Sequence, residues 1–149
     1  MPKSKFKLYA TVHLFLFHEG KVLLLRRFNT GYEDGNYSVI AGYKNDNEQV
    51  KAAMIREAQE EAGIDLTERD LDVIGIMHRK PEDEHIDFFL AATIWSGQVV
   101  NKEPDKCDEL AWFDEHRLPK NVIPYIRRAL ENYRRNDYRG VWFDTCDWD

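Results

Sequence analysis

The chain has 149 residues, 43% of them hydrophobic and 32% charged, a composition that fits a globular domain with one core. A net charge of −6 argues against a surface that coats a nucleic acid polymer. No apolar run reaches the roughly 18 residues of a membrane span, and the N-terminal sequence MPKSKFK lacks a signal-peptide core. Cys107 and Cys146 share no metal-site spacing and fit reduced thiols, so we expect a cytoplasmic protein that contacts no membrane.

The N-terminal part of the sequence predicts a β-hairpin, a loop and a short strand. Residues 7–17 alternate and are rich in β-formers, residues 22–27 (VLLLRR) form a second such run, and a turn-like HEGK joins them. Residues 28–36 contain asparagine, aspartate and two glycines, which indicates a loop. Residues 37–41 are expected to form a short strand that leads into Gly42.

Residues 42–64 predict a loop followed by an amphipathic helix. Asn45 and Glu48 have the spacing of a capping box, and Asn47 is an alternative N-cap. Gly63 is expected to end the helix in a left-handed conformation. Apolar residues recur at helical spacing and predict a buried stripe: Val50, Met54, Ile55, Ala58 and Ala62.

The rest of the chain predicts further strands and a second helix. The expected strands cover residues 71–79, 85–95 and 110–113. Polar segments connect them: residues 64–70, 80–84 and 97–109. Residues 122–135 predict an amphipathic helix with Pro124 in its first turn. The aromatic tail, residues 141–148, is open to three interpretations: it covers the core, it covers a cleft, or it pairs with a second copy in a homodimer. Together these elements predict one α+β domain over residues 1–149.

Three carboxylates crowd one face of the first predicted helix. Glu57, Glu60 and Glu61 stand at positions i, i+3 and i+4, where like charges destabilise a helix by roughly a few tenths of a kcal/mol per pair. Hard oxygen ligands beside a loop rich in backbone groups suit Mg²⁺ or Mn²⁺, particularly when a substrate phosphate adds further oxygens. For an isolated E-x-x-E-E pattern, however, a solvated acidic face is the more frequent structure.

The wider pattern resembles the signature of the Nudix hydrolase family, G-x5-E-x7-R-E-U-x-E-E-x-G-U, in which U is aliphatic. Every fixed position matches: Gly42, Glu48, Arg56, Glu57, Glu60, Glu61 and Gly63, with Ala58 and Ile64 at the aliphatic places. Seven such matches arise by chance on the order of once in 10⁸ start positions. The resemblance implies the Nudix fold, a mixed β-sheet sandwiched between α-helices.

The resemblance also implies a metal site for Mg²⁺ or Mn²⁺. Its expected ligands are Glu57, Glu60 and Glu61. The backbone carbonyl of Ala41 is a further ligand, because Ala41 takes the middle place of a run that is often Pro-Gly-Gly in the family. Glu103 resembles the family's extra metal-binding glutamate, with plain loop surface as the alternative.

The remaining predicted site residues are catalytic or contact substrate. Different members of the family use different carboxylates as the general base, so Glu60 and a glutamate in a late loop are both candidates for that role. Arg56 is expected to donate two hydrogen bonds to the carboxylate of Glu48 or Glu60 and so to orient the glutamates. Glu48 is expected to be a helix cap or a partner that holds Arg56, with metal ligation as the second interpretation. Three residues at strand ends are candidates for substrate contact, with a solvated surface as the alternative: Arg26, Arg27 and His78.

The implied reaction is Mg²⁺-dependent hydrolysis of a diphosphate linkage in a small nucleoside diphosphate derivative. The short chain resembles the MutT-like branch that cleans the nucleotide pool, which makes a nucleoside triphosphate pyrophosphohydrolase the leading expectation. ADP-ribose or nucleotide-sugar pyrophosphatases are the alternative, and Pro81 lies close to a proline common in the ADP-ribose enzymes. A non-catalytic nucleotide-sensing module is the third reading, although such modules usually lose signature glutamates that this chain keeps.

Overall fold

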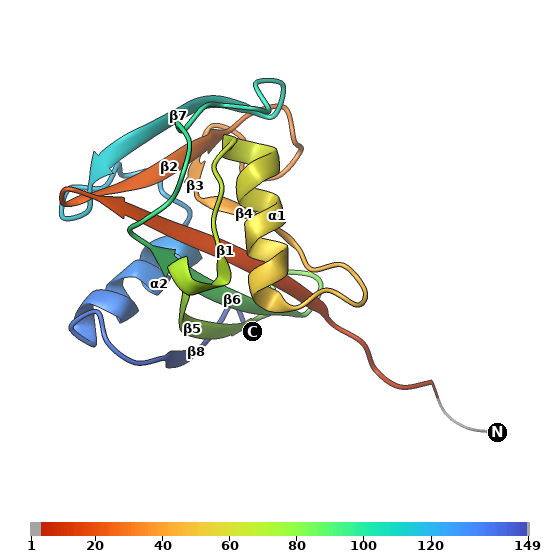
Figure 1. The fold of residues 1–149 in the computed structure, drawn as a ribbon. Helices are drawn as coiled ribbons and strands as arrows, with labels where there is room; N and C mark the ends of the chain where they lie inside the picture. The colour runs from red at the N-terminus through yellow and green to blue at the C-terminus, as the bar shows by residue number, and fades with distance from the viewer. Residues whose placement is uncertain (1–3, 149) are drawn as a thin grey trace.

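The computed structural model describes residues 4–148, which form a mixed β-sheet with a long helix on each side (Figure 1). The strands are β1 (Tyr9–His18), β2 (Lys21–Arg27), β3 (Tyr37–Ser38), β4 (Ile40–Tyr43), β5 (Asp72–Arg79), β6 (His85–Ala92), β7 (Cys107–Asp114) and β8 (Trp142–Cys146). The helices are α1 (Val50–Ala62), α2 (Pro124–Arg135) and the short 3₁₀ helix η1 (Glu68–Asp70). The predicted α+β fold with a sheet between helices is confirmed.

Strand β1 is the centre of the sheet, whose order is β3-β2-β1-β6-β5-β8, with β4 paired to β1 and β7 to β2. It runs parallel to β6 and antiparallel to both β2 and β4. Strand β4 pairs with the middle of β1, from Thr11 to Leu14, and leads directly toward α1. This pairing brings the loop that precedes α1 next to the central strand.

Alternate residues of β1 face opposite helices, as the period of two in a strand requires. Val12, Leu14 and Leu16 belong to a buried cluster that also contains Met54 and Ala58 of α1. The intervening Phe15 belongs to a second cluster, which contains residues of α2 and β5: Ile74, Met77, Ile126, Ala129 and Leu130. The sheet therefore separates two apolar cores that share one strand.

The start of α1 differs from the sequence-based prediction. Neither Asn45 nor Asn47 caps the helix, which begins at Val50 after Gln49, and Gln49 makes no capping bond with its side chain. The Asn45–Glu48 pair instead closes a turn before the helix, where the Asn45 amide donates to Oε1 of Glu48 at 2.9 Å. The helix end is as predicted, because Gly63 adopts the left-handed conformation with a φ of 67°.

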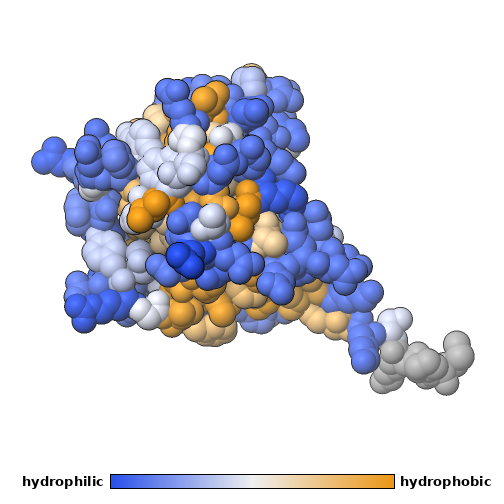
Figure 2. Space-filling view, in the orientation of Figure 1, coloured by the Kyte–Doolittle hydropathy of each residue, from blue (hydrophilic) through white to orange (hydrophobic). Residues whose placement is uncertain are grey.

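The aromatic tail forms a strand that the sequence did not predict. Strand β8 pairs parallel to β5, from Gly75 opposite Trp142 to Arg79 opposite Cys146. Trp142 is buried against Phe89, and Phe143, on the opposite face, is 68% exposed. Figure 2 shows an apolar band along the lower edge of the molecule, where Figure 1 places β5, β6 and β8. The interpretation in which the tail covers the core is therefore confirmed for Trp142, and pairing of the tail with a second copy stays a prediction.

Several boundaries also differ from the prediction. The strand predicted over residues 85–95 ends at Ala92, and the one predicted over residues 37–41 is two strands, β3 and β4, the second of which contains Gly42. Strand β7 begins at Cys107, three residues before the predicted strand, because its first residues pair with the end of β2. The predicted linker 64–70 contains η1, which Thr67 and Asp70 close as a capping box. None of the helices within residues 4–148 is long and apolar enough to cross a membrane.

Candidate active site

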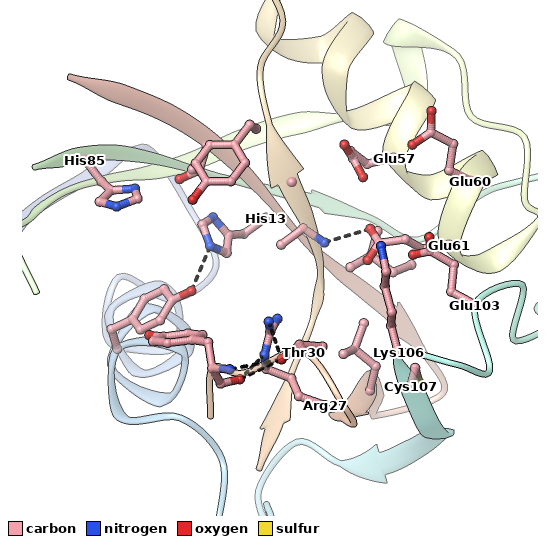
Figure 3. A pocket seen from close by; sticks show the side chains of 18 of the residues that line it. His13, Arg27, Thr30, Glu57, Glu60, Glu61, His85, Glu103, Lys106 and Cys107 are labelled. Carbon is pink, nitrogen blue, oxygen red and sulfur yellow. Dashed lines mark hydrogen bonds between the residues drawn. The ribbon is translucent and has the colours of Figure 1, made fainter. Parts of the chain in front are cut away.

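A cavity of about 890 Å³ opens between α1, the middle of β1 and the loop that follows β2. Figure 3 shows four carboxylates on one side of it: Glu57, Glu60, Glu61 and Glu103. His13 and His85 lie on the opposite side, and the Arg27 side chain projects into the space between (Figure 3). The cavity is therefore acidic at one end and lined by rings at the other.

Glu61 is partly buried, as are Glu57 and Glu103, whereas Glu60 is exposed. Oε2 of Glu61 accepts a hydrogen bond from the Ala41 backbone amide at 3.1 Å, which ties the helix to β4. Burial raises the pKa of Glu61 well above its ordinary value, and repulsion from Glu57 and Glu103 raises it further. Burial also raises the pKa of Glu57, against the opposing effect of Arg56. The chain thus collects more negative charge here than its own cations neutralise.

Gly42 makes room for Glu57. A Cβ atom on Gly42 would overlap the Glu57 carboxyl group, lying 2.6 Å from Oε2 and closer still to Cδ and Oε1. Gly42 lies on β4 opposite Val12 of β1, so its backbone cannot retreat without disturbing the sheet. A residue without a side chain is needed at this position for α1 to present its carboxylate against the strand.

The loop that contains Glu103 is fixed to the end of α1. The Lys102 amide donates to the backbone oxygen of Glu61 at 3.1 Å, and the Val100 amide donates to that of Ala62 at 3.0 Å. These carbonyls belong to the last turn of the helix, which has no partner for them within the helix. The loop therefore completes the helix end and, in doing so, brings Glu103 close to Glu61.

Arg56 connects the signature glutamates. Its Nε and Nη2 donate to the two carboxylate oxygens of Glu48 at 2.8 and 3.0 Å. Its Nη1 donates to Glu57 at 2.7 Å and to Glu60 at 3.3 Å. A further bond from Nη2 reaches the Tyr43 backbone oxygen at 3.0 Å. The guanidinium lowers the pKa of Glu48 to about 2, so Glu48 remains ionised and Arg56 is held in place.

Three comparisons with known proteins agree with this geometry. The model of the NUDIX domain matches residues 7–133. The chain belongs to the Nudix family. An ADP-ribose pyrophosphatase from Methanocaldococcus jannaschii is 26% identical over 137 residues, covering 89% of this chain and 79% of that protein.

Solved structures of Nudix proteins have the same fold. A MutT NUDIX hydrolase from Burkholderia pseudomallei superimposes with a TM-score of 0.77 and 25% identity, over 85% of this chain and 98% of the other. The MutT protein from Methanosarcina mazei Go1 gives a TM-score of 0.78 at 22% identity, over 92% of this chain and all of the other. The chain is accordingly a Nudix hydrolase, an enzyme that acts on phosphoric anhydride bonds.

The three predicted substrate contacts occupy different places in this Nudix hydrolase. Arg27 lines the cavity, where its Nε donates to the Tyr32 backbone oxygen at 2.7 Å. Arg26 points to the other face of β2 and pairs with Asp108 at 2.7 Å, away from the cavity lining. His78 is likewise outside the lining, 2.7 Å from Glu84 and in edge contact with Trp148. Arg26 and His78 are not positioned to contact a substrate in the cavity.

Several residues that line the Nudix cavity were missed by sequence reasoning. They come from seven separate segments: His13, Tyr32, Tyr43, Arg79, His85, Lys106 and Tyr125. None belongs to a motif with recognisable spacing, because the cavity assembles from strands that meet only in the folded sheet. The one available signal was the placement of polar His13 in the middle of an apolar strand.

The donor set suits a divalent cation. Across residues 4–148, no three His, Cys, Asp or Glu side chains already converge as a metal-binding group. The buried Glu61 carboxyl, with Glu57 and Glu103 near it, nevertheless supplies hard oxygens whose repulsion a dication would relieve. Nudix hydrolases are generally dependent on divalent metals, in agreement with this chemistry.

Proposed function

We propose that this Nudix hydrolase uses Mg²⁺ or Mn²⁺ to cleave a diphosphate linkage in a nucleoside diphosphate derivative. A nucleoside triphosphate, hydrolysed to a monophosphate and pyrophosphate, is the first candidate substrate. The observation that supports this most strongly is the buried Glu61 carboxyl beside Glu57 and Glu103 on the wall of a cavity large enough for a nucleotide. Arg27 and Lys106 line the same cavity and supply positive charge for phosphate groups.

Five groups are the proposed metal ligands: the carboxylates of Glu57, Glu60, Glu61 and Glu103 and the backbone carbonyl of Ala41. A divalent cation held by these groups would supply positive charge to neutralise the phosphates of the substrate. The Ala41 amide already donates to Glu61, so the same peptide segment orients one ligand and offers another. Arg56 is itself held by its ion pair with Glu48, and its direct ion pairs with Glu57 and Glu60 fix the positions of those two carboxylates.

The chain also offers a group to accept a proton from the attacking water. Glu60 is the better candidate, because its side chain is 53% exposed, lines the cavity and is held at 3.3 Å from Arg56. Glu103 is the alternative base. In either case the water oxygen bonds to phosphorus, the bridging P–O bond breaks, and the departing oxygen leaves as a phosphate anion.

ADP-ribose is the second candidate substrate. The Methanocaldococcus jannaschii relative is named an ADP-ribose pyrophosphatase. In this chain Pro81, Glu82 and Asp83 also line the cavity of about 890 Å³. The two candidates differ in what lies beyond the diphosphate, which a substrate panel separates directly.

The deciding experiment measures Mg²⁺-dependent hydrolysis of nucleoside triphosphates, ADP-ribose and nucleotide sugars, with products identified by ³¹P NMR. We expect turnover of at least one class, and Glu61→Gln should lower kcat by at least about a hundredfold, the scale of losing a group that stabilises developing charge. Glu131→Gln, on the exposed face of α2, is the matched control and should be unchanged. Tight binding without turnover of any compound would instead indicate a nucleotide sensor.

A further inference from the structure

The end of the cavity away from the glutamates contains a buried arginine. Arg79 is only 5% exposed, yet it lines the cavity. Its Nε donates to Oδ2 of Asp87 at 2.7 Å, and its Nη2 approaches Oδ1 of Asp87 at 3.4 Å. Thr11 also donates to Asp87, which is fully buried. Both oxygens of Asp87 therefore have hydrogen-bond donors within the protein, and the bonds to Arg79 fix the orientation of the guanidinium.

Both of these bonds leave one edge of Arg79 available. A guanidinium has five N–H donors, and Asp87 takes those of Nε and one of Nη2. The Tyr125 ring covers one face of the guanidinium, with Cζ 3.8 Å from the ring centroid. The other three donors, on Nη1 and Nη2, do not bond to Asp87; the Tyr32 hydroxyl lies beside the guanidinium and can accept one, which leaves two for whatever occupies the cavity.

Several rings lie around Arg79, and the carboxylates of Glu82 and Asp83 also line the cavity. The rings of Tyr43 and His85 lie 6.2 Å apart at 31°, and His13 bonds to the Tyr125 hydroxyl at 3.1 Å. Burial lowers the pKa values of His13 and His85, so both imidazoles are neutral at pH 7. The buried Nδ1 of His85 lacks a hydrogen-bond partner among residues 4–148, which leaves a polar atom for a bound ring. Neutral rings with fixed donors match a heteroaromatic base, and the nearby carboxylates disfavour a phosphate.

We propose that this end of the cavity binds the nucleobase and that Arg79 selects a 6-oxopurine over a 6-aminopurine. A 6-oxopurine presents two adjacent acceptors, O6 and N7, which match a pair of guanidinium donors. In adenine the 6-position carries an amino donor, which would face the donors of Arg79 and leave them unpaired. This inference rests on the proposed nucleotide substrate and adds which base that nucleotide carries.

The test compares binding of inosine and adenosine 5′-monophosphates by isothermal titration calorimetry without metal, so that no turnover is required. The two ligands differ only in the purine ring around position 6. We expect inosine monophosphate to bind at least about tenfold more tightly. 7-Deazainosine monophosphate, which lacks N7, should lose most of that advantage on the unaltered protein, so this arm depends on no variant's folding.

A variant then assigns the preference to Arg79. Arg79→Lys keeps the positive charge beside Asp87 but cannot present paired donors, and it should bring the two affinities within about threefold of each other. Arg128→Lys is the matched control, because Arg128 also forks onto an aspartate, Asp144, but on α2 outside the cavity lining. Equal binding of the two nucleotides by the unaltered protein, or an unchanged ratio in a folded Arg79→Lys protein, would overturn the inference. A retained preference without hydrolysis of any substrate would contradict the proposed function alone.

Discussion

Gly42 and Glu57 occupy adjoining space: the position that a Cβ of Gly42 would take overlaps the carboxyl group of Glu57. The contact explains why the residue at position 42, which faces Glu57 of the acidic helix, is a glycine. Strand β4 must pass close to α1 so that the Ala41 peptide reaches Glu61, and a larger residue at position 42 would displace the neighbouring carboxylate. The glycine and the glutamate form one structural unit.

This relationship predicts a loss of activity without a comparable loss of stability. Gly42→Ala should move the Glu57 carboxylate and lower kcat by at least about tenfold, because a small misplacement of a catalytic group has a large effect. Gly75→Ala is the contrasting variant: its Cβ would overlap the buried Trp142 ring, so it should lower the melting temperature. Steady-state kinetics and thermal unfolding on both proteins make the comparison, and a Gly42→Ala protein of normal activity would contradict the reading of this contact.

Arg27 and its neighbour Arg26 provide a second matched pair. Only Arg27 lines the cavity, so Arg27→Gln should raise KM for a phosphorylated substrate about tenfold, the scale of a lost hydrogen bond to a charged group. Arg26→Gln should leave KM unchanged, because Arg26 is occupied by Asp108. Initial-rate kinetics over a range of substrate concentrations measure both. Equal effects of the two substitutions would remove Arg27 from the substrate site.

Glu103 is a proposed metal ligand and Glu109 has a structural role, so the two glutamates form a matched pair for mutation. Glu103 lines the cavity beside Glu61, whereas Glu109 accepts a hydrogen bond from the Tyr37 hydroxyl at 2.7 Å. Glu103→Gln should raise the Mg²⁺ concentration for half-maximal activity several-fold and leave the melting temperature unaltered. Glu109→Gln should leave the metal requirement as it is. If both titrations match that of the unaltered protein, Glu103 belongs to the loop surface.

Buried His13 makes stability depend on pH. Burial lowers its pKa from 6.5 to about 4, so between these values the unfolded chain binds a proton that the folded chain does not. The free energy of unfolding therefore falls as pH drops from 6.5 to 4, by up to about 3 kcal/mol from this residue. In urea titrations His13→Gln should show a flatter pH dependence across this window. His116→Gln, at a 63% exposed side chain, should keep the original slope, and identical slopes for both variants would contradict the assignment.

Local patterns predicted α1 and its acidic face because both depend on residues within one helix. The apolar stripe, the Gly63 cap and the i, i+3, i+4 glutamates are all set by helical periodicity. The predicted N-cap was wrong because Glu48, the partner in the expected capping box, bonds to Arg56 as well as to the Asn45 amide, and the turn closes before the helix begins.

The ring-lined end of the cavity was beyond sequence reasoning because its residues meet only across strands. Arg79 and Asp87 are on neighbouring antiparallel strands, and Thr11 joins them through the parallel pairing of β1 with β6. Strand β8 was missed for a related reason: a parallel partner is distant in the chain and leaves no turn signal. His78 was placed near the substrate from its strand position alone, but its side chain lies on the opposite face from Arg79.

Manganese binding tests the central claim most directly, namely that the carboxylates of α1 hold a divalent cation. The anomalous signal of crystals soaked in Mn²⁺ locates the ion without reference to activity. We predict a peak between Glu57, Glu61 and the Ala41 carbonyl, and its loss in crystals of Glu57→Gln and Glu61→Gln proteins. An ion bound elsewhere, or none at this position with those side chains apart, would contradict the account.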